Sequence, residues 1–185
     1  MNKKKIIIIM LSIMLIAVIS MCINYFANSK KIYKYSVDYI NNNEFEESII
    51  EQEIFENSKI GTLTIPKINL YDIPICESVE LETLSKSIGH FENTSIYKGN
   101  VGLASHNAGT NANYFANIHK LKIGDEIEYK TNYGVRIYKV DSITEIDSYD
   151  WSKLEDTEDN RITLITCISG KENSRLCVQA VEKIK

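Results

Sequence analysis

The chain has 185 residues, which is enough for one domain with a sizeable core and too few for two ordinary domains. Its first 30 residues contain four of the 21 basic residues and none of the 25 acidic ones, so the remainder carries 17 basic and 25 acidic residues, a formal net charge of −8. An acidic domain argues against a nucleic-acid partner, because phosphate binding requires clustered lysine and arginine.

An uncharged apolar run from Ile6 to Ile23 follows three lysines at positions 3 to 5. The run approaches the roughly 20 residues that a transmembrane helix needs, and the lysines predict a cytoplasmic N-terminus with the rest of the chain outside. A cleaved signal peptide is the competing interpretation, but Tyr25 stands two before Ala27, where cleavage favours a small residue. We therefore expect residues 1–27 to be a cytoplasmic tip and single-pass anchor in the cell membrane, with the folded domain extracellular.

Residues 28–58 are polar and rich in Glu and Asn, and they carry apolar side chains such as Ile40, Phe45 and Ile49 at helical spacing. We expect a polar stalk here. An amphipathic helix is one interpretation of it, and a mostly disordered tether is the other. The folded domain is expected at residues 59–185.

Short strand-like runs separated by turn residues make up this domain. Pro74 lies inside one of them and places that strand at a sheet edge or bulge, because proline cannot donate to a strand ladder. Short helices are expected near residues 81–87 and 114–121. So many strands with so few helices indicate an all-β barrel or sandwich rather than alternating strands and helices. The expected strands are residues 60–66, 71–76, 88–91, 100–107, 126–129, 135–146, 161–168 and 176–184.

Three of the four cysteines, Cys76, Cys167 and Cys177, follow the apolar run and would lie outside the membrane. The sequence has no C-x-x-C motif and no Cys/His cluster at metal-ligand spacing, so we expect no metal, no cofactor and no disulfide framework. An odd number leaves at least one thiol unpaired within the chain, whether or not Cys76 pairs with Cys177. An unpaired thiol in an exported protein favours a catalytic role.

Cys167, His106 and Arg175 are the candidates for an active site. Cys167 and His106 each stand at the end of a strand-like run, and Arg175 opens the next one. A thiolate is a good nucleophile beside a basic or cationic group, histidine transfers protons near neutral pH, and arginine offers a fixed fork of donors to an oxyanion. Each residue also has a simpler interpretation, respectively a small core side chain, a structural histidine and a surface ion pair.

The string T-L-I-T-C at residues 163–167 is followed by R-L-C-V at 175–178 and preceded by A-S-H-N at 104–107. In combination these strings resemble the sortase transpeptidases of Gram-positive bacteria. The resemblance runs through most of the domain and includes I-P-K-I-N-L-Y-D-I-P-I (65–75) and G-H-F-E-N-T (89–94). It implies a closed all-β barrel of about eight strands with short helices, preceded by an N-terminal transmembrane helix.

The resemblance also implies roles. Cys167 would attack the Thr–Gly carbonyl of an L-P-x-T-G-like sorting signal at the C-terminus of a surface protein, while His106 would protonate the leaving amine and deprotonate the incoming one. Arg175 would hold the substrate backbone and stabilise the oxyanion. The amine of a peptidoglycan precursor would then resolve the thioacyl-enzyme. Further substrate-binding positions are expected at Ala104, Trp151 and Thr166.

The class of sortase is predicted from loops. Pilin-polymerising members typically carry a lid with an Asp-Pro-aromatic element before the barrel, and this sequence has no such element. Class B members carry a long helical insertion where this chain has only residues 169–174. Class A or class D remains, and class D is preferred. Residues 147–160 would form the loop before the nucleophile strand, with Trp151 as an apolar floor or a loop anchor. Their acidic side chains are interpreted as solvated charges rather than as a calcium site.

Other functions stay open from the sequence. A pilin-polymerising sortase and a cysteine peptidase or hydrolase of cell-surface peptides would use the same residues, and an anchored module without catalysis would only bind peptides. An L,D-transpeptidase is disfavoured, because Leu164-Ile165-Thr166 stands where that class has a His-Gly pair before its cysteine.

Overall fold

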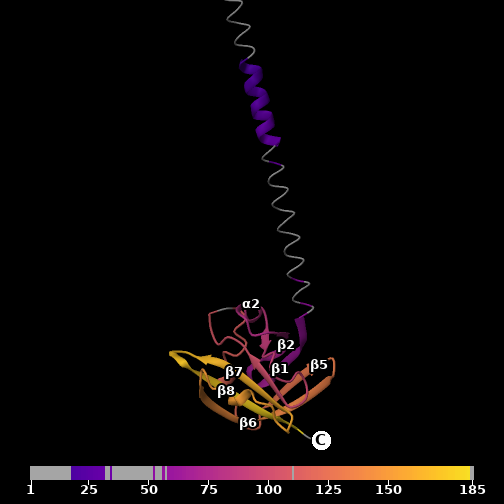
Figure 1. Ribbon diagram of the computed structural model, residues 1–185, viewed down its shortest axis with the longest axis vertical. Coiled ribbons are helices and arrows are strands. Elements are labelled where there is room, and N and C mark those ends of the chain that lie inside the picture. The colour runs from indigo at the N-terminus through magenta and orange to yellow at the C-terminus, as the bar shows by residue number, and fades with distance from the viewer. Residues whose placement is uncertain are drawn as a thin grey trace, which may run out of the picture. The chain divides into compact units, whose positions relative to one another are not determined.

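A computed structural model of the chain describes residues 18–31, 34, 52, 56, 58–109 and 111–183. The chain divides into two compact units, Met1–Ile54 and Phe55–Lys185. In the first unit, residues 18–31 form a helix, coloured indigo in Figure 1. None of the helices in the described stretches is long and apolar enough to cross a bilayer. Much of the predicted anchor and most of the predicted stalk lie outside the described residues, and the proposed division at residues 27 and 58 stays a prediction.

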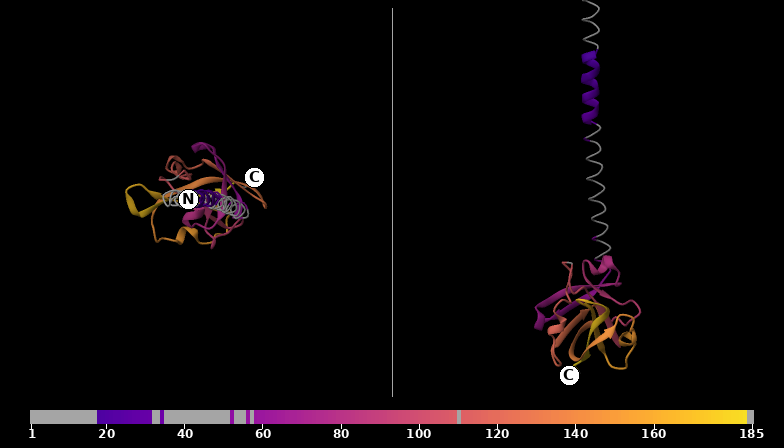
Figure 2. Two further views of the ribbon diagram at one scale, coloured as in Figure 1. Left: turned by 90° about the horizontal axis from the view of Figure 1, so that it is seen from above. Right: turned by 90° about the vertical axis from the view of Figure 1, so that its left-hand side faces the viewer.

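The second unit is a closed β-barrel (Figures 1 and 2). Its strand order is β1-β2-β3-β4-β7-β8-β6-β5, and β5 pairs back onto β1 to close the ring. The all-β barrel with short helices is thus confirmed, and the sandwich is excluded. The strands are β1 (Lys59–Ile65), β2 (Leu70–Glu77), β3 (Ile88–His90), β4 (Asn100–Ala104), β5 (Glu126–Thr131), β6 (Gly134–Asp147), β7 (Arg161–Ile168) and β8 (Lys171–Glu182).

Short helical turns connect several of the strands. They are η1 (Pro66–Ile68), α2 (Leu81–Leu84), η2 (Ile118–Lys120) and η3 (Ser152–Leu154). The helix expected over residues 114–121 is reduced to η2, and asparagines at positions 111, 113 and 117 favour turns over a regular helix there. Pro74 has the edge-like position expected of it, because β3 pairs only with Ile75–Glu77 and leaves Pro74 with β1 as its one neighbour.

Strand β8 begins five residues earlier than its apolar residues predict. Ser169 and Gly170 make a tight turn, in which Gly170 has a φ of 78° that favours glycine, and Lys171 already pairs with Ile168. The register then jumps to Cys167 opposite Arg175, so residues 172–174 form a bulge without partners on β7, while Ser174 still pairs with Asp147 of β6. Residues 171–174 at the start of β8 are all polar, so the sequence gives no indication that they belong to a strand.

The interior of the barrel is filled by aliphatic side chains and two tyrosines, Tyr129 and Tyr138, which are fully buried. The hydroxyl of Tyr129 donates to the Ile96 carbonyl at 2.7 Å. Strands β4 and β7 form a parallel pair, and their runs N-V-G-L-A and I-T-L-I-T are almost continuously buried. Both faces of this pair are therefore covered, as is usual for parallel strands.

One face of β4, β7 and β8 carries three rows of side chains, because residues two apart on a strand share a face. The ladder places Gly102, Thr163 and Gln179 in one row and Ala104, Ile165 and Cys177 in the next. The row beyond contains Cys167 and Arg175. The middle row is apolar and forms a second buried cluster with Phe91, Ile146 and Leu154.

A buried polar network anchors the first row. Asn100 donates through Nδ2 to the carbonyls of Lys153 and Glu155, both at 2.9 Å, and accepts from Thr163 Oγ1 at 2.7 Å. Gln179 Nε2 donates to the same Thr163 hydroxyl at 3.1 Å. These bonds fasten η3, and with it the loop between β6 and β7, onto the barrel.

Gly102 is the residue that lets this loop pack closely. A Cβ atom at Gly102 would lie 2.7 Å from Leu154 Cδ2 and 3.1 Å from Phe91 Cδ2, closer than ordinary van der Waals contact. Glycine on β4 therefore allows Phe91 and Leu154 to cover the apolar row, and this layer becomes the base of the site.

Candidate active site

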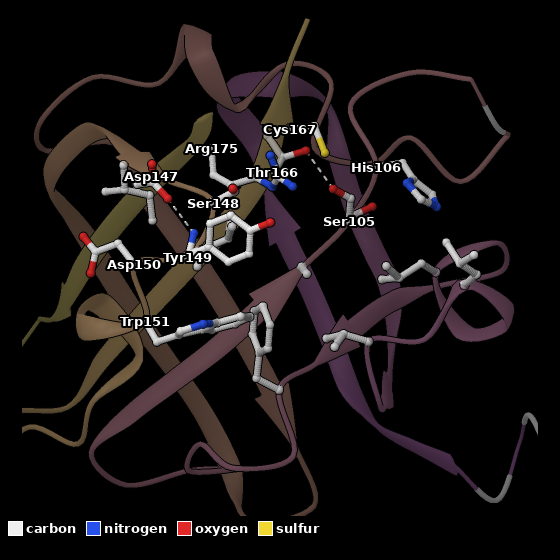
Figure 3. A pocket seen from close by; sticks show the side chains of 17 residues that line it. Ser105, His106, Asp147, Ser148, Tyr149, Asp150, Trp151, Thr166, Cys167 and Arg175 are labelled. Carbon is white, nitrogen blue, oxygen red and sulfur yellow. Dashed lines mark hydrogen bonds between the residues drawn. The ribbon is translucent and has the colours of Figure 1, made fainter. Parts of the chain in front are cut away.

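Strand order brings the three candidate catalytic residues together. Strand β7 lies between β4 and β8, and Cys167 is its penultimate residue. His106 follows the end of β4 by two residues, and Arg175 of β8 is the direct partner of Cys167 across the β7–β8 ladder. Cys167 thus lies between His106 and Arg175, an arrangement that Figure 3 also shows.

These residues share a pocket of about 440 Å³. One wall is apolar and comes from the segment around α2, from Phe91 and from the loop after β6. All six predicted site residues line it, namely Ala104, His106, Trp151, Thr166, Cys167 and Arg175. The structure therefore brings the predicted site together, while the role of each residue stays a prediction.

Cys167 combines an exposed side chain with a fixed backbone. Its neighbours Ile165 and Thr166 are buried, whereas Cys167 itself is exposed to the pocket. Its carbonyl oxygen accepts a hydrogen bond from Asn107 Nδ2 at 2.6 Å. A thiol on a rigid strand end is accessible to a substrate and contributes little to core packing.

Arg175 is held by the bulge of β8. Its Nη1 donates to the carbonyl oxygens of Glu172 and Ser174, each at 2.9 Å. The backbone of the bulge continues the support, since Ser148 N donates to the Asn173 carbonyl at 2.9 Å. One end of the guanidinium is thus fixed by neutral acceptors, and the fork keeps further donors for a ligand in the pocket.

His106 differs from the other two histidines of the chain. His90 is fully buried, with Nδ1 2.9 Å from Glu77 Oε1 and Nε2 3.1 Å from the Ser95 carbonyl. His119 Nδ1 lies 3.0 Å from the Ala116 carbonyl. His106 is half-buried and lines the pocket, and no described residue makes a hydrogen bond to its ring. It is therefore the histidine whose ring nitrogens are available for chemistry.

Thr166 connects the two strand ends. Its Oγ1 donates to the Ser105 carbonyl at 2.7 Å, and the side chain is buried (Figure 3). This hydroxyl is therefore already bonded to the neighbouring strand end, and Thr166 is also one of the residues that line the pocket. Trp151, which is 58% exposed, packs edge-on against Phe91 with ring centroids 6.0 Å apart.

The buried thiol beside the site is chemically different from Cys167. Burial raises the pKa of Cys177 to about 11, which keeps it protonated near neutral pH. The described residues contain no disulfide, so Cys177 remains a core thiol of the apolar row rather than half of a crosslink.

The acidic loop after β6 is organised by its own turns. Asp147 accepts from Tyr149 N at 2.8 Å, and Asp150 accepts from the N–H and hydroxyl of Ser152, which lower the pKa of its carboxyl. Among the residues that the structure describes, no three His, Cys, Asp or Glu side chains converge on a metal position. The loop instead presents Tyr149 and Trp151 to the pocket.

Several residues that line the pocket were not predicted from the sequence. Leu81 and Leu84 of α2 form part of the apolar wall, and their three-residue spacing on a helical turn was the available signal. Tyr149, 80% exposed, was hidden in an acidic loop. The bond of Asn107 to the Cys167 carbonyl had no signal, because it joins residues 60 positions apart.

The sequence of this chain is similar to those of known proteins. The family model for the Sortase domain matches residues 63–183. Sortase A of Bacillus anthracis is 37% identical over 122 residues, which are 65% of this chain and 58% of that protein. Sortase A of Listeria monocytogenes is 26% identical over 127 residues, which are 69% of this chain and 57% of that protein. The chain thus matches less than two thirds of the length of these curated relatives.

Solved structures agree. A pilus-related sortase C of Group B Streptococcus superposes with a TM-score of 0.63 at 30% identity, covering 69% of this chain and 68% of that one. Sortase A from Corynebacterium diphtheriae has the same TM-score at 27% identity, covering 69% and 61%. The family model spans the segment that contains His106, Cys167 and Arg175, and the chain belongs to the sortase family.

Proposed function

We propose that the protein is a cysteine transpeptidase that cleaves a sorting signal of the L-P-x-T-G type and joins its threonine carbonyl to an amine. The observation that carries the proposal is the order His106–Cys167–Arg175 across three adjacent strands at one pocket. A nucleophile between a proton-transfer group and a cationic donor is what acyl transfer requires.

In the first half-reaction the Cys167 thiol gives its proton to His106 and its sulfur attacks the threonine carbonyl. A thioester forms, the Thr–Gly C–N bond breaks, and His106 passes that proton to the leaving amine. In the second half-reaction an acceptor amine attacks the thioester, its proton passes to His106 and from there to the Cys167 sulfur, and the C–S bond breaks to regenerate the thiol. Both steps conserve atoms and charge without an external redox partner.

Arg175 stabilises both tetrahedral intermediates. Its position as the cross-strand partner of Cys167, in the same pocket, supports placing its guanidinium beside the carbon under attack. With Nη1 bonded to the bulge carbonyls, the remaining donors are preorganised for the oxyanion and the substrate backbone.

The apolar wall fits the leucine and proline of such a signal. Leu81, Tyr149 and Trp151 are each more than half exposed on this wall in the structure. Exposed apolar side chains that gather at one concave surface mark a binding site. We assign them to the residues that precede the threonine.

We also propose that residues 6–23 anchor the protein in the cell membrane, with the barrel on the extracellular side. The support is the uncharged apolar run behind three lysines in the sequence. An extracellular barrel would have surface proteins and peptidoglycan precursors within reach as donors and acceptors.

Peptidoglycan-precursor amines are the acceptors that we favour, as in sortases of class A or class D, with class D preferred. The tight Ser169-Gly170 turn between β7 and β8 supports this choice over class B. Pilin polymerisation is the second candidate, because a pilus-related sortase C is among the similar structures. The acceptor separates them, since polymerisation would use an amine of a pilin rather than one of a peptidoglycan precursor.

The full-length chain incubated with a quenched L-P-x-T-G peptide tests the proposal. With a small amine present we expect a transpeptidation product, identified by mass spectrometry, and slower hydrolysis without it. Hydrolysis at an unchanged rate in both conditions would identify a peptidase instead. Binding without turnover would identify a peptide-binding module.

A further inference from the structure

The chain keeps its contact with β7 after β4 has ended. Ser105 N donates to the Ile165 carbonyl at 3.4 Å, and Thr166 Oγ1 donates to the Ser105 carbonyl at 2.7 Å. Asn107 Nδ2 then donates to the Cys167 carbonyl at 2.6 Å and lies 3.5 Å from Ser169 Oγ. Side chains thus extend the β4–β7 ladder as far as the nucleophile.

His106 lies between two of these connections. Ser105 is tied on one side and Asn107 on the other, and the His106 carbonyl accepts from Phe115 N at 3.2 Å, where the loop returns. Beyond Asn107 the chain is exposed at Ala108 and Gly109. Asn107 is therefore the last residue that fixes the outgoing chain before the open part of the loop.

We propose that Asn107 is a positioning residue, and that its amide sets the placement of His106 relative to Cys167. The inference rests on the function proposed above. Because the acceptor is the carbonyl of the nucleophile itself, this hydrogen bond joins the residue after His106 directly to Cys167. An amide suits the position, since an aspartate of the same shape has no N–H to donate when ionised.

Kinetics distinguish positioning from packing. Proton transfer requires hydrogen-bond distance, and a displacement of about 1 Å costs as much as about 100-fold in rate. We expect Asn107→Ala and Asn107→Asp each to lower kcat about 10- to 100-fold and to change KM less than about 2-fold, because the apolar wall is untouched. Asn107→Gln keeps the donor and should recover part of kcat.

Asn113→Ala is the matched control, because Asn113 is an exposed asparagine in the same loop whose side chain bonds to no described residue. It should leave kcat and KM unchanged. All variants should melt within about 2 °C of the wild type, since an exposed hydrogen bond contributes little to stability. In a His106→Ala background, Asn107→Ala should cause no further loss.

A readout without turnover separates this inference from the proposed function. The chain has three histidines, so their imidazole resonances are individually assignable by NMR of the full-length protein. Asn107→Ala should shift or broaden the His106 resonances and leave those of His90 and His119 in place. That result supports the positioning role even if the wild type forms no transpeptidation product, which would contradict only the proposed function.

Two results would overturn the inference. One is a set of His106 resonances in Asn107→Ala that matches the wild type. The other is a kcat for Asn107→Ala equal to that of Asn113→Ala in an active enzyme. Either would show that the bonds at Ser105 and the Phe115 N–His106 carbonyl bond hold His106 without Asn107, and that Asn107 is a surface turn residue.

Discussion

Two polar rows lie on the same face of β4, β7 and β8, separated by one apolar row, and they have opposite character. In the first, Thr163 and Gln179 are buried with Asn100 and bonded to one another or to loop carbonyls. In the second, Cys167 is exposed, and His106 and Arg175 keep ring nitrogens and donors turned to a pocket. Polar groups with all partners in place stabilise a fold, whereas those with spare capacity at a surface are available for a substrate.

The apolar row between them makes this difference possible. Ile165 and Cys177 pack with Phe91, Ile146 and Leu154, so a layer of buried apolar side chains separates the first row from the second. The same strands can therefore hold a satisfied network and an open site four residues apart, at Thr163 and Cys167 of β7. The predictions below separate the two rows, from the largest effect to the smallest.

Replacing the proposed nucleophile should have the largest effect on activity and almost none on folding. Cys167→Ala should reduce transpeptidation at least about 10⁴-fold, because no other group supplies the thioester. The melting temperature should stay within about 2 °C, since the side chain is exposed. Cys177→Ala is the control. It should keep activity, and its free energy of unfolding should fall by about 1 kcal/mol because the lost sulfur leaves a cavity in the core. Activity in Cys167→Ala would end the proposed mechanism.

Arg175→Lys should lower kcat by about 10²- to 10³-fold, the usual cost of losing a preorganised oxyanion donor. A lysine keeps the charge but cannot bond the bulge carbonyls of Glu172 and Ser174 while presenting a second donor. Steady-state kinetics with an L-P-x-T-G peptide measure the effect. Arg161→Lys, in a residue that pairs with Asp141 and Asp159 away from the pocket, should retain near-normal kcat. Equal rates for the two variants would reduce Arg175 to a structural residue.

Asn100→Ala should act on stability first. It removes three hydrogen bonds, to the Thr163 hydroxyl and to the carbonyls of Lys153 and Glu155, of which Thr163 and Lys153 keep bonds with Gln179, at a cost of about 2–3 kcal/mol. Thermal unfolding should show a melting temperature lower by about 5–10 °C. Activity at low temperature should survive, and a variant that lost activity with unchanged stability would place Asn100 in the site instead.

Trp151→Ala should have the smallest effect. Its ring is largely exposed and contacts Phe91 by one edge, so its loss removes part of the apolar wall without opening the core. We expect KM for a leucine-containing signal to rise about 3- to 10-fold with kcat nearly unchanged, corresponding to about 1 kcal/mol of lost contact. A fall in kcat alone would contradict the assignment of this wall to substrate binding.

Much of the fold could be read from the sequence, because each strand is a short apolar run between turn residues. The run I-T-L-I-T-C predicted β7 and its buried character, and motif strings selected Cys167, His106 and Arg175. The start of β8 could not be predicted, since its first arm is K-E-N-S and its pairing depends on the turn at Gly170 and on contacts with β6.

The pairing of strands that lie far apart in the sequence was the other feature that could not be predicted. Strands β4 and β7 are parallel, and their pairing brings His106 next to Cys167 across about 60 residues of intervening chain. Local periodicity carries no signal for a pairing of this range. The bond from Asn107 to the Cys167 carbonyl and the apolar wall of α2 follow from the same closure.

The thioacyl-enzyme is the most direct test of the central claim. The full-length chain is incubated with an L-P-x-T-G peptide without acceptor amine, and intact-mass and peptide-mapping spectra locate the adduct. We predict the acyl fragment ending in threonine on Cys167, with Cys22, Cys76 and Cys177 unmodified, and its release as an amide on adding an amine. An adduct on another cysteine, or no adduct while the peptide is cleaved, would contradict the account.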